Sequence, residues 1–132
     1  MRQRYLILAA AWLEIVTGVV LVAMLEVACP LLLAATPEGV GVPLGRLAGI
    51  GLLALGIACL PSEDGPRRNT VLGLLVYNGG VFILTVWLGL ATPFHGLLLW
   101  PAVGLHAILT ALLAQFLAKG SFVQKTLHKL SR

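Results

Sequence analysis

Residues 9–20 read AAAWLEIVTGVV, an apolar run with one carboxylate, Glu14, in its middle. Such a run is typical of a membrane-spanning helix. The whole chain has the same character, since 59% of its 132 residues are hydrophobic and only 11% are charged, which excludes an ordinary soluble domain. A carboxylate at the centre of a span costs about 3 kcal/mol to insert, so we expect Glu14 to face the protein interior and to have a partner there.

Apolar runs divide the chain, which is long enough for four helices of about 20 residues each. Prolines mark several boundaries: Pro30 is expected to end the first helix, Pro43 to lie in the first turn of the second, and Pro61 to follow it. Pro101, near the start of the fourth helix, is either a first-turn residue or a kink. We predict an all-α fold, an integral membrane four-helix bundle in one domain, residues 1–118. The helices are expected at residues 5–29, 43–60, 70–90 and 96–118.

The positive charges lie in short polar segments beside the apolar runs. Eight of the nine Lys and Arg residues fall in three such segments, at residues 2–4, 67–68 and 119–132. All three lie on one side of a four-span chain, so the positive-inside rule puts both termini in the cytoplasm. The basic excess is thus a topology signal, and we expect no nucleic-acid partner. Cys29 and Cys59 then lie near opposite membrane faces and are predicted to be free thiols.

The last segment, residues 119–132, combines basic and apolar side chains. Phe122, Leu127 and Leu130 lie among lysines. This spacing favours a short basic amphipathic helix on an anionic membrane surface. The alternative is a frayed polar tail that serves only solubility and topology.

Three polar side chains lie near the middle of their predicted helices: Glu14 in the first, Asn78 in the third and His106 in the fourth. All three are therefore expected near the midplane of a hydrocarbon core about 30 Å thick. Thr17 follows Glu14, and Thr110 follows His106, at helical spacing, so each extends a polar stripe. We predict that the stripes face one another and that these five residues form a ligand or proton site.

Each polar residue also has a packing interpretation. Intramembrane Asn and Thr side chains often join helices, at well under about 2 kcal/mol apiece, and Asn78 and Thr85 fit that role. For Glu14 and His106 we favour a function, because packing requires no ionisable group at the midplane. Such a pair can exchange a proton or hold the polar head of a ligand. Tyr77 is interpreted as a packing residue.

Two further features concern helix packing and the outer membrane surface. Glu26 and Arg46 are expected at the same depth, as a structural ion pair or as two snorkelling side chains. Gly45 and Gly49 allow close approach of a neighbouring helix, and with Gly73 they indicate that another chain covers part of the surface. The cysteine spacing predicts no metal site, and no cofactor is expected.

The resemblance to known proteins is carried by segments in all four predicted helices. They are Leu13-Glu14 and Thr17-Gly18 in the first helix, GRLAGIGLLALGIAC at residues 45–59, LLVYNGG at 74–80 and LLLWPAVGLHAIL at 97–109. With these segments the chain resembles a group of small bacterial four-span membrane proteins whose layout is similar to that of the DoxX-like proteins. The resemblance implies a multi-pass protein of the bacterial inner membrane. Some DoxX-like proteins look like membrane partners of quinone-linked oxidoreductases, so an accessory role is implied, but no functional residue is assigned.

The polar residues support two functional hypotheses. The first is a non-enzymatic accessory or binding subunit, in a homo-oligomer or a larger membrane complex, that holds a lipid or quinone-like head group near Glu14, Asn78 and His106. The second is a proton-coupled exporter working as a homodimer, because small multidrug exporters are similar four-span proteins with one carboxylate in the first helix, as Glu14 is here. Glu26, Arg46 and His106 depart from that pattern, since a positive charge near the carboxylate repels cationic substrates.

Overall fold

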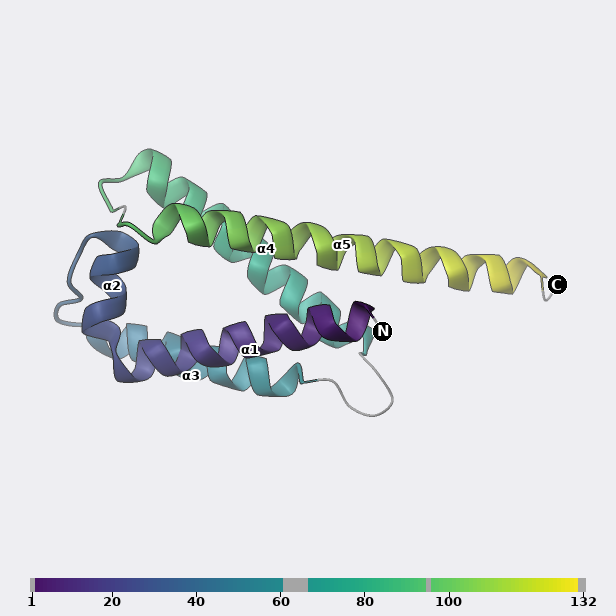
Figure 1. Ribbon diagram of the computed structural model, residues 1–132, viewed down its shortest axis with the longest axis horizontal. Coiled ribbons are helices and arrows are strands. Elements are labelled where there is room, and N and C mark those ends of the chain that lie inside the picture. The colour runs from purple at the N-terminus through teal and green to yellow at the C-terminus, as the bar shows by residue number, and fades with distance from the viewer. Residues whose placement is uncertain (1, 61–66, 95, 131–132) are drawn as a thin grey trace.

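Every regular element is a helix in the part of the chain that the structure describes, a computed structural model covering residues 2–60, 67–94 and 96–130. The predicted all-α class is thereby confirmed. Pro61, predicted to follow the second span, lies outside the described residues. The helices, drawn in Figure 1, are α1 (Arg2–Ala23), α2 (Leu25–Leu33), α3 (Gly41–Ala58), α4 (Arg68–Ala91) and α5 (Leu99–Leu130).

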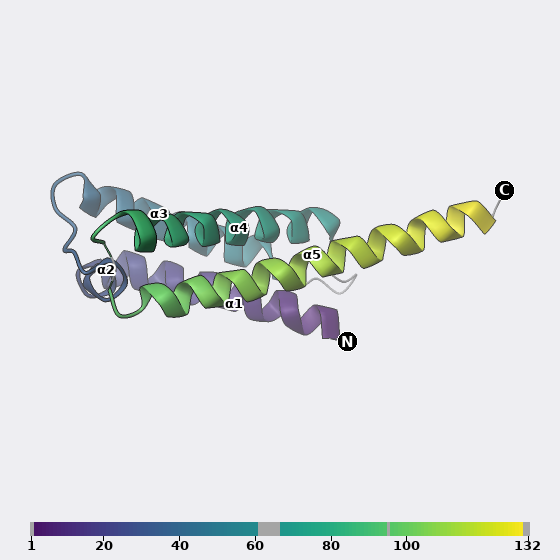
Figure 2. The same cartoon turned by 90° about the horizontal axis from the view of Figure 1, so that it is seen from above.

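Four of these helices are long and apolar enough to cross a membrane, which makes the chain a multi-pass membrane protein. The candidate spans are Arg4–Ala23, Gly41–Ala58, Arg68–Ala91 and Leu99–Ala118. The chain enters α1 and leaves α5 at the same end of the bundle, where α5 extends beyond the other helices (Figure 1 and Figure 2). The short helix α2 lies across the opposite end.

The first long helix ends at Ala23, not at Cys29 as predicted. The backbone turns at Met24, with φ −134° and ψ 36°, and α2 starts at Leu25. Pro30 lies inside α2, so the prediction that it ends a helix is wrong. A proline removes one N–H from the backbone ladder, a loss that this short helix tolerates. Figure 2 shows α2 end-on beside the long helices, which confirms that it runs across them.

The bounds of α3 and α4 differ from prediction by only two residues at most. α3 begins at Gly41, which keeps Pro43 in its first turn, and it ends at Ala58 rather than at residue 60. α4 covers Arg68–Ala91 instead of 70–90. Differences of this size are ordinary at helix ends, where the last turn frays.

α5 starts three residues later than predicted and continues to Leu130. Pro101 is its third residue, so it is a first-turn proline and not a kink. The segment predicted as a basic tail from residue 119 continues the helix α5 as far as Leu130 (Figure 1). The side chains that would make the tail amphipathic lie outside the described part of the structure.

Close packing of small residues joins α1 to α3, while α4 packs along α5. A Cβ added at Gly49 would lie 2.9 Å from the carbonyl oxygen of Gly18. One added at Gly45 would lie 2.7 Å from the side chain of Leu25. Gly45 and Gly49 therefore face helices of their own chain, which corrects the inference that they point to a second chain. Gly73 has open space around it.

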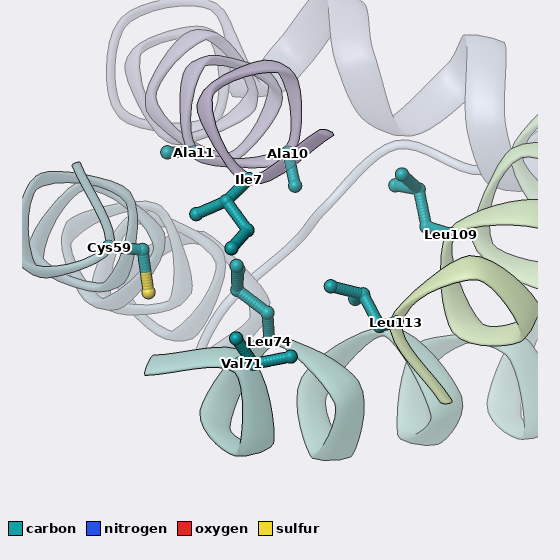
Figure 3. Close-up of a cluster of buried hydrophobic side chains, with 8 residues drawn as sticks. All are labelled: Ile7, Ala10, Ala11, Cys59, Val71, Leu74, Leu109 and Leu113. Atoms are coloured by element: carbon teal, nitrogen blue, oxygen red, sulfur yellow. The ribbon is translucent and has the colours of Figure 1, made fainter. Parts of the chain in front are cut away.

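An apolar core connects the two helix pairs towards the end where α1 begins (Figure 3). Its side chains come from α1, α4, α5 and the end of α3. Cys59 belongs to this core and is a free thiol, as is Cys29, in agreement with the prediction. The members of the core are Ile7, Ala10, Ala11, Cys59, Val71, Leu74, Leu109 and Leu113.

Candidate functional site

Glu14, Asn78 and His106 meet next to this core. Asn78 Nδ2 donates to Glu14 Oε1 over 3.3 Å, and His106 Nδ1 lies 2.7 Å from Asn78 Oδ1. Asn78 is fully buried, and Glu14 is 1% exposed. The sequence predicts a direct pair of Glu14 and His106, whereas in the structure the Asn78 amide stands between them. Asn78 is therefore the central member of this polar cluster.

The hydrogen bonds of Asn78 determine which ring nitrogen of His106 carries a proton. Asn78 Nδ2 also donates to the backbone carbonyl oxygen of Leu74 over 2.9 Å, and a carbonyl oxygen can only accept. The amide oxygen of Asn78 must therefore face His106. Because that oxygen is also only an acceptor, His106 Nδ1 must be the donor. In a neutral imidazole the other ring nitrogen, Nε2, is then an acceptor.

A cavity of about 370 Å³ lies between the two helix pairs, beyond the polar cluster. Along α1, the buried core residues Ile7, Ala10 and Ala11 precede Glu14, whereas the cavity residues are Leu13, directly beside Glu14, and Thr17 and Leu21, which follow it. The wall of the cavity is mostly apolar. The volume of the cavity is within the range of small-molecule sites, about 300–1,000 Å³. His106 is the member of the cluster that lines the cavity, whereas Glu14 and Asn78 are not wall residues.

Few of the residues that line the cavity are polar, and three of them carry a side-chain polar group without a hydrogen-bond partner among the described residues. These groups are the hydroxyls of Thr17 and Tyr77 and the Nε2 atom of His106. Thr85 also lines the cavity, but its hydroxyl donates to carbonyl oxygens of the preceding turn of α4, at 2.8 and 3.1 Å. A few polar groups in an apolar wall are what orients a bound ligand.

The positions of Tyr77 and Thr110 in the structure differ from the roles predicted for them from the sequence. Tyr77 lines the cavity, and its ring meets that of His106 edge-on, with centroids 6.3 Å apart. The sequence feature that could have predicted Tyr77 as a cavity residue is its position directly before Asn78, at the same depth in the membrane. Thr110 does not reach the cavity: its hydroxyl is buried without a partner among the described residues, and its methyl group lies at Gly79 of α4. Thr110 therefore belongs to the contact between α4 and α5.

The short helix α2 borders the cavity through Leu32. The backbone N–H of Gly96 donates to the carbonyl oxygen of Leu32 over 2.9 Å, and that of Leu98 donates to Leu31 over 2.8 Å. These bonds satisfy carbonyl groups at the end of α2 that its own helix leaves free. They also join α2 to the segment before α5, and both Leu32 and Leu98 line the cavity.

Glu26 and Arg46 form an ion pair away from this site, with Arg46 Nη2 at 3.3 Å from Glu26 Oε1. Both side chains are more than half exposed. We expect Arg46→Gln to change the free energy of unfolding by less than about 1 kcal/mol, because exposed ion pairs contribute little. Denaturant titrations of the two proteins in one detergent would measure the difference, and a loss of several kcal/mol would contradict this structural description of the pair.

No three His, Cys, Asp or Glu side chains in the described ranges lie close enough together to hold a metal ion. No protein-family model matches the chain, and neither a curated protein nor a solved structure matches it. The features of the molecule that bear on its function are therefore the polar cluster and the cavity.

Proposed function

We propose that the protein is an accessory or binding subunit of the bacterial inner membrane that holds a lipid or quinone-like head group between its helices. The distribution of Lys and Arg supports a cytoplasmic location for both termini. The observation that carries the proposal is the apolar cavity of about 370 Å³, whose few free polar groups, on Thr17, Tyr77 and His106, come from helices that meet at the polar cluster.

An amphiphile with one polar end suits this arrangement. Its apolar part would contact the leucine and valine side chains of the wall, and each Å² of apolar surface removed from water contributes about 25 cal/mol. Its head group would reach the hydroxyls of Thr17 and Tyr77 and the ring of His106. Because the surrounding helices are candidate membrane spans, such a ligand would reach the cavity from the lipid phase.

The accessory role extends the resemblance to DoxX-like proteins, in a homo-oligomer or a larger complex. α4 presents apolar side chains that need a cover of lipid or of a neighbouring subunit, since Val76 and Leu90 are 74% exposed and Ile83 is 69% exposed. The alternative of a proton-coupled exporter has weaker support. Its carboxylate would have to meet the substrate, yet Glu14 is buried, bound by Asn78 and absent from the cavity wall.

We expect Ala102→Phe to reduce bound ligand at least about tenfold, because Ala102 lines the cavity and a phenyl ring there would occupy it. Ala111→Phe is the matched control, since Ala111 lies on the exposed side of the same helix. The measurement is native mass spectrometry of the full-length protein, released gently from its own membranes, which reports subunits and retained small molecules together.

The wild-type protein and Ala111→Phe are expected to retain a lipid or a quinone, and a heteromeric assembly would identify the complex that the subunit serves. A wild-type protein without any retained molecule would contradict the proposal, as would equal loss in both variants. A bare homodimer that releases protons when organic cations are added would favour the exporter.

A further inference from the structure

We infer that the bound head group donates a hydroxyl hydrogen to His106 Nε2, so that the site selects an alcohol, phenol or quinol over the matching ether or ketone. The inference rests on the proposed function. It adds that the protein supplies the acceptor of this hydrogen bond and the ligand supplies the donor. It follows from the polar cluster and the cavity taken together.

The direction of the hydrogen bonds is imposed by groups that no ligand touches. Asn78 Nδ2 donates to the Leu74 carbonyl oxygen and to Glu14 Oε1, and both of these lie on the same side of the amide. Turning the amide over would place its oxygen against two acceptors and its NH₂ group against His106. The observed orientation therefore keeps the amide oxygen on His106 Nδ1, which carries the hydrogen, and leaves a lone pair on Nε2 of a ring that lines the cavity.

The other free groups of the wall do not discriminate between a donor and an acceptor. The hydroxyls of Thr17 and Tyr77 can each donate or accept, so a ketone satisfies them as well as an alcohol does. His106 Nε2 in the neutral ring can only accept. A head group without a donor hydrogen would leave it unpaired in a mostly apolar cavity, which lowers affinity.

The first measurement is the ¹⁵N spectrum of histidine-labelled, full-length protein in lipid nanodiscs. The chain has three histidines, and the signal lost in His106→Asn identifies the ring in question. We expect a neutral ring with its hydrogen on Nδ1 and a bare Nε2. A hydrogen on Nε2, in the other neutral tautomer or in the charged ring, would overturn the inference.

The second measurement compares 4-octylphenol with 4-octylanisole, which differ only in the hydroxyl hydrogen that the anisole replaces by a methyl group. Calorimetric titration of the wild-type protein should show the phenol binding about tenfold more tightly. His106→Asn can still donate to Asn78 but has no atom at the position of Nε2, so it should lose that preference. Ala111→Phe, on the exposed side of the same helix and outside the cavity wall, should leave the preference in place.

The outcomes separate this inference from the proposed function. Equal binding of the two probes to the wild-type protein, or tighter binding of the anisole, would overturn the inference alone. Binding of neither probe would overturn both. Displacement of the phenol by decylhydroquinone would support the inference with a quinol as the source of the hydroxyl, and displacement by dioleoylglycerol would support it with a lipid alcohol.

Discussion

Replacing Asn78 with Asp is expected to lower the free energy of unfolding by about 3 kcal/mol, although the two side chains have nearly the same size. A carboxylate cannot donate, so the variant loses the bonds to the Leu74 carbonyl oxygen and to Glu14. It also brings the new carboxyl group at position 78 against the Glu14 carboxyl group, at a contact where Asn78 Nδ2 and Glu14 Oε1 are 3.3 Å apart in the wild-type protein. Denaturant unfolding of the full-length protein in one detergent, followed by circular dichroism, would measure the loss.

Thr85→Val is the matched control for Asn78→Asp. It removes a buried polar group from the same helix, but the Thr85 hydroxyl bonds only to carbonyl oxygens of α4 itself. Those carbonyl oxygens keep their helical hydrogen bonds, so the control should change stability by less than about 1 kcal/mol. If Asn78→Asp were no more destabilising than Thr85→Val, the amide would not be the link between α1, α4 and α5.

A second substitution tests whether the donor is what Asn78→Asp loses. In the double variant Asn78→Asp with Glu14→Gln, donor and acceptor change places, because the new amide on α1 can donate to the new carboxylate on α4. We expect at least half of the lost stability to return. No recovery would show that the damage arises elsewhere in the cluster.

The lengths of the apolar runs and the depths of the polar residues could be predicted from the sequence. Four spans follow from composition, because hydrocarbon thickness sets how many apolar residues a helix needs. The depths of Glu14, Asn78 and His106 follow from the rise per residue. Depth does not say how far each helix is rotated about its axis, so the position of Asn78 between the other two could not be predicted.

The break between α1 and α2 has no local cause in the sequence. Met24 is neither glycine nor proline, and the proline that attracts attention, Pro30, lies inside the next helix. The bonds that hold α2 across the bundle come from Gly96 and Leu98, far along the chain. A break maintained by such distant contacts cannot be predicted from a local sequence pattern, and neither can the cavity that α2 borders.

Gly56→Ala is expected to cost about 1–3 kcal/mol of stability, because it would force α1 and α3 apart. A Cβ at Gly56 would lie 2.7 Å from the carbonyl oxygen of Ala11 and 2.9 Å from the backbone nitrogen of Ile15. Backbone atoms cannot move aside as a side-chain end can, so α1 itself must shift. Thermal unfolding of the full-length protein in one detergent would report the loss.

Gly51→Ala is the control on the same helix, since a Cβ there would meet nothing within 4 Å. Alanine favours the helix over glycine by about 1 kcal/mol, so this control should be neutral or stabilising.

The comparison of Gly56→Ala with Gly51→Ala also bears on the candidate site, because Glu14 lies between the contacts that α1 makes with α3 through Ala11 and Gly18. Shifting α1 should weaken the bond from Asn78 to Glu14 and reduce ligand retention. Equal stability of the two variants would mean that α1 and α3 are not packed backbone to backbone, and the position of Glu14 would then need another cause.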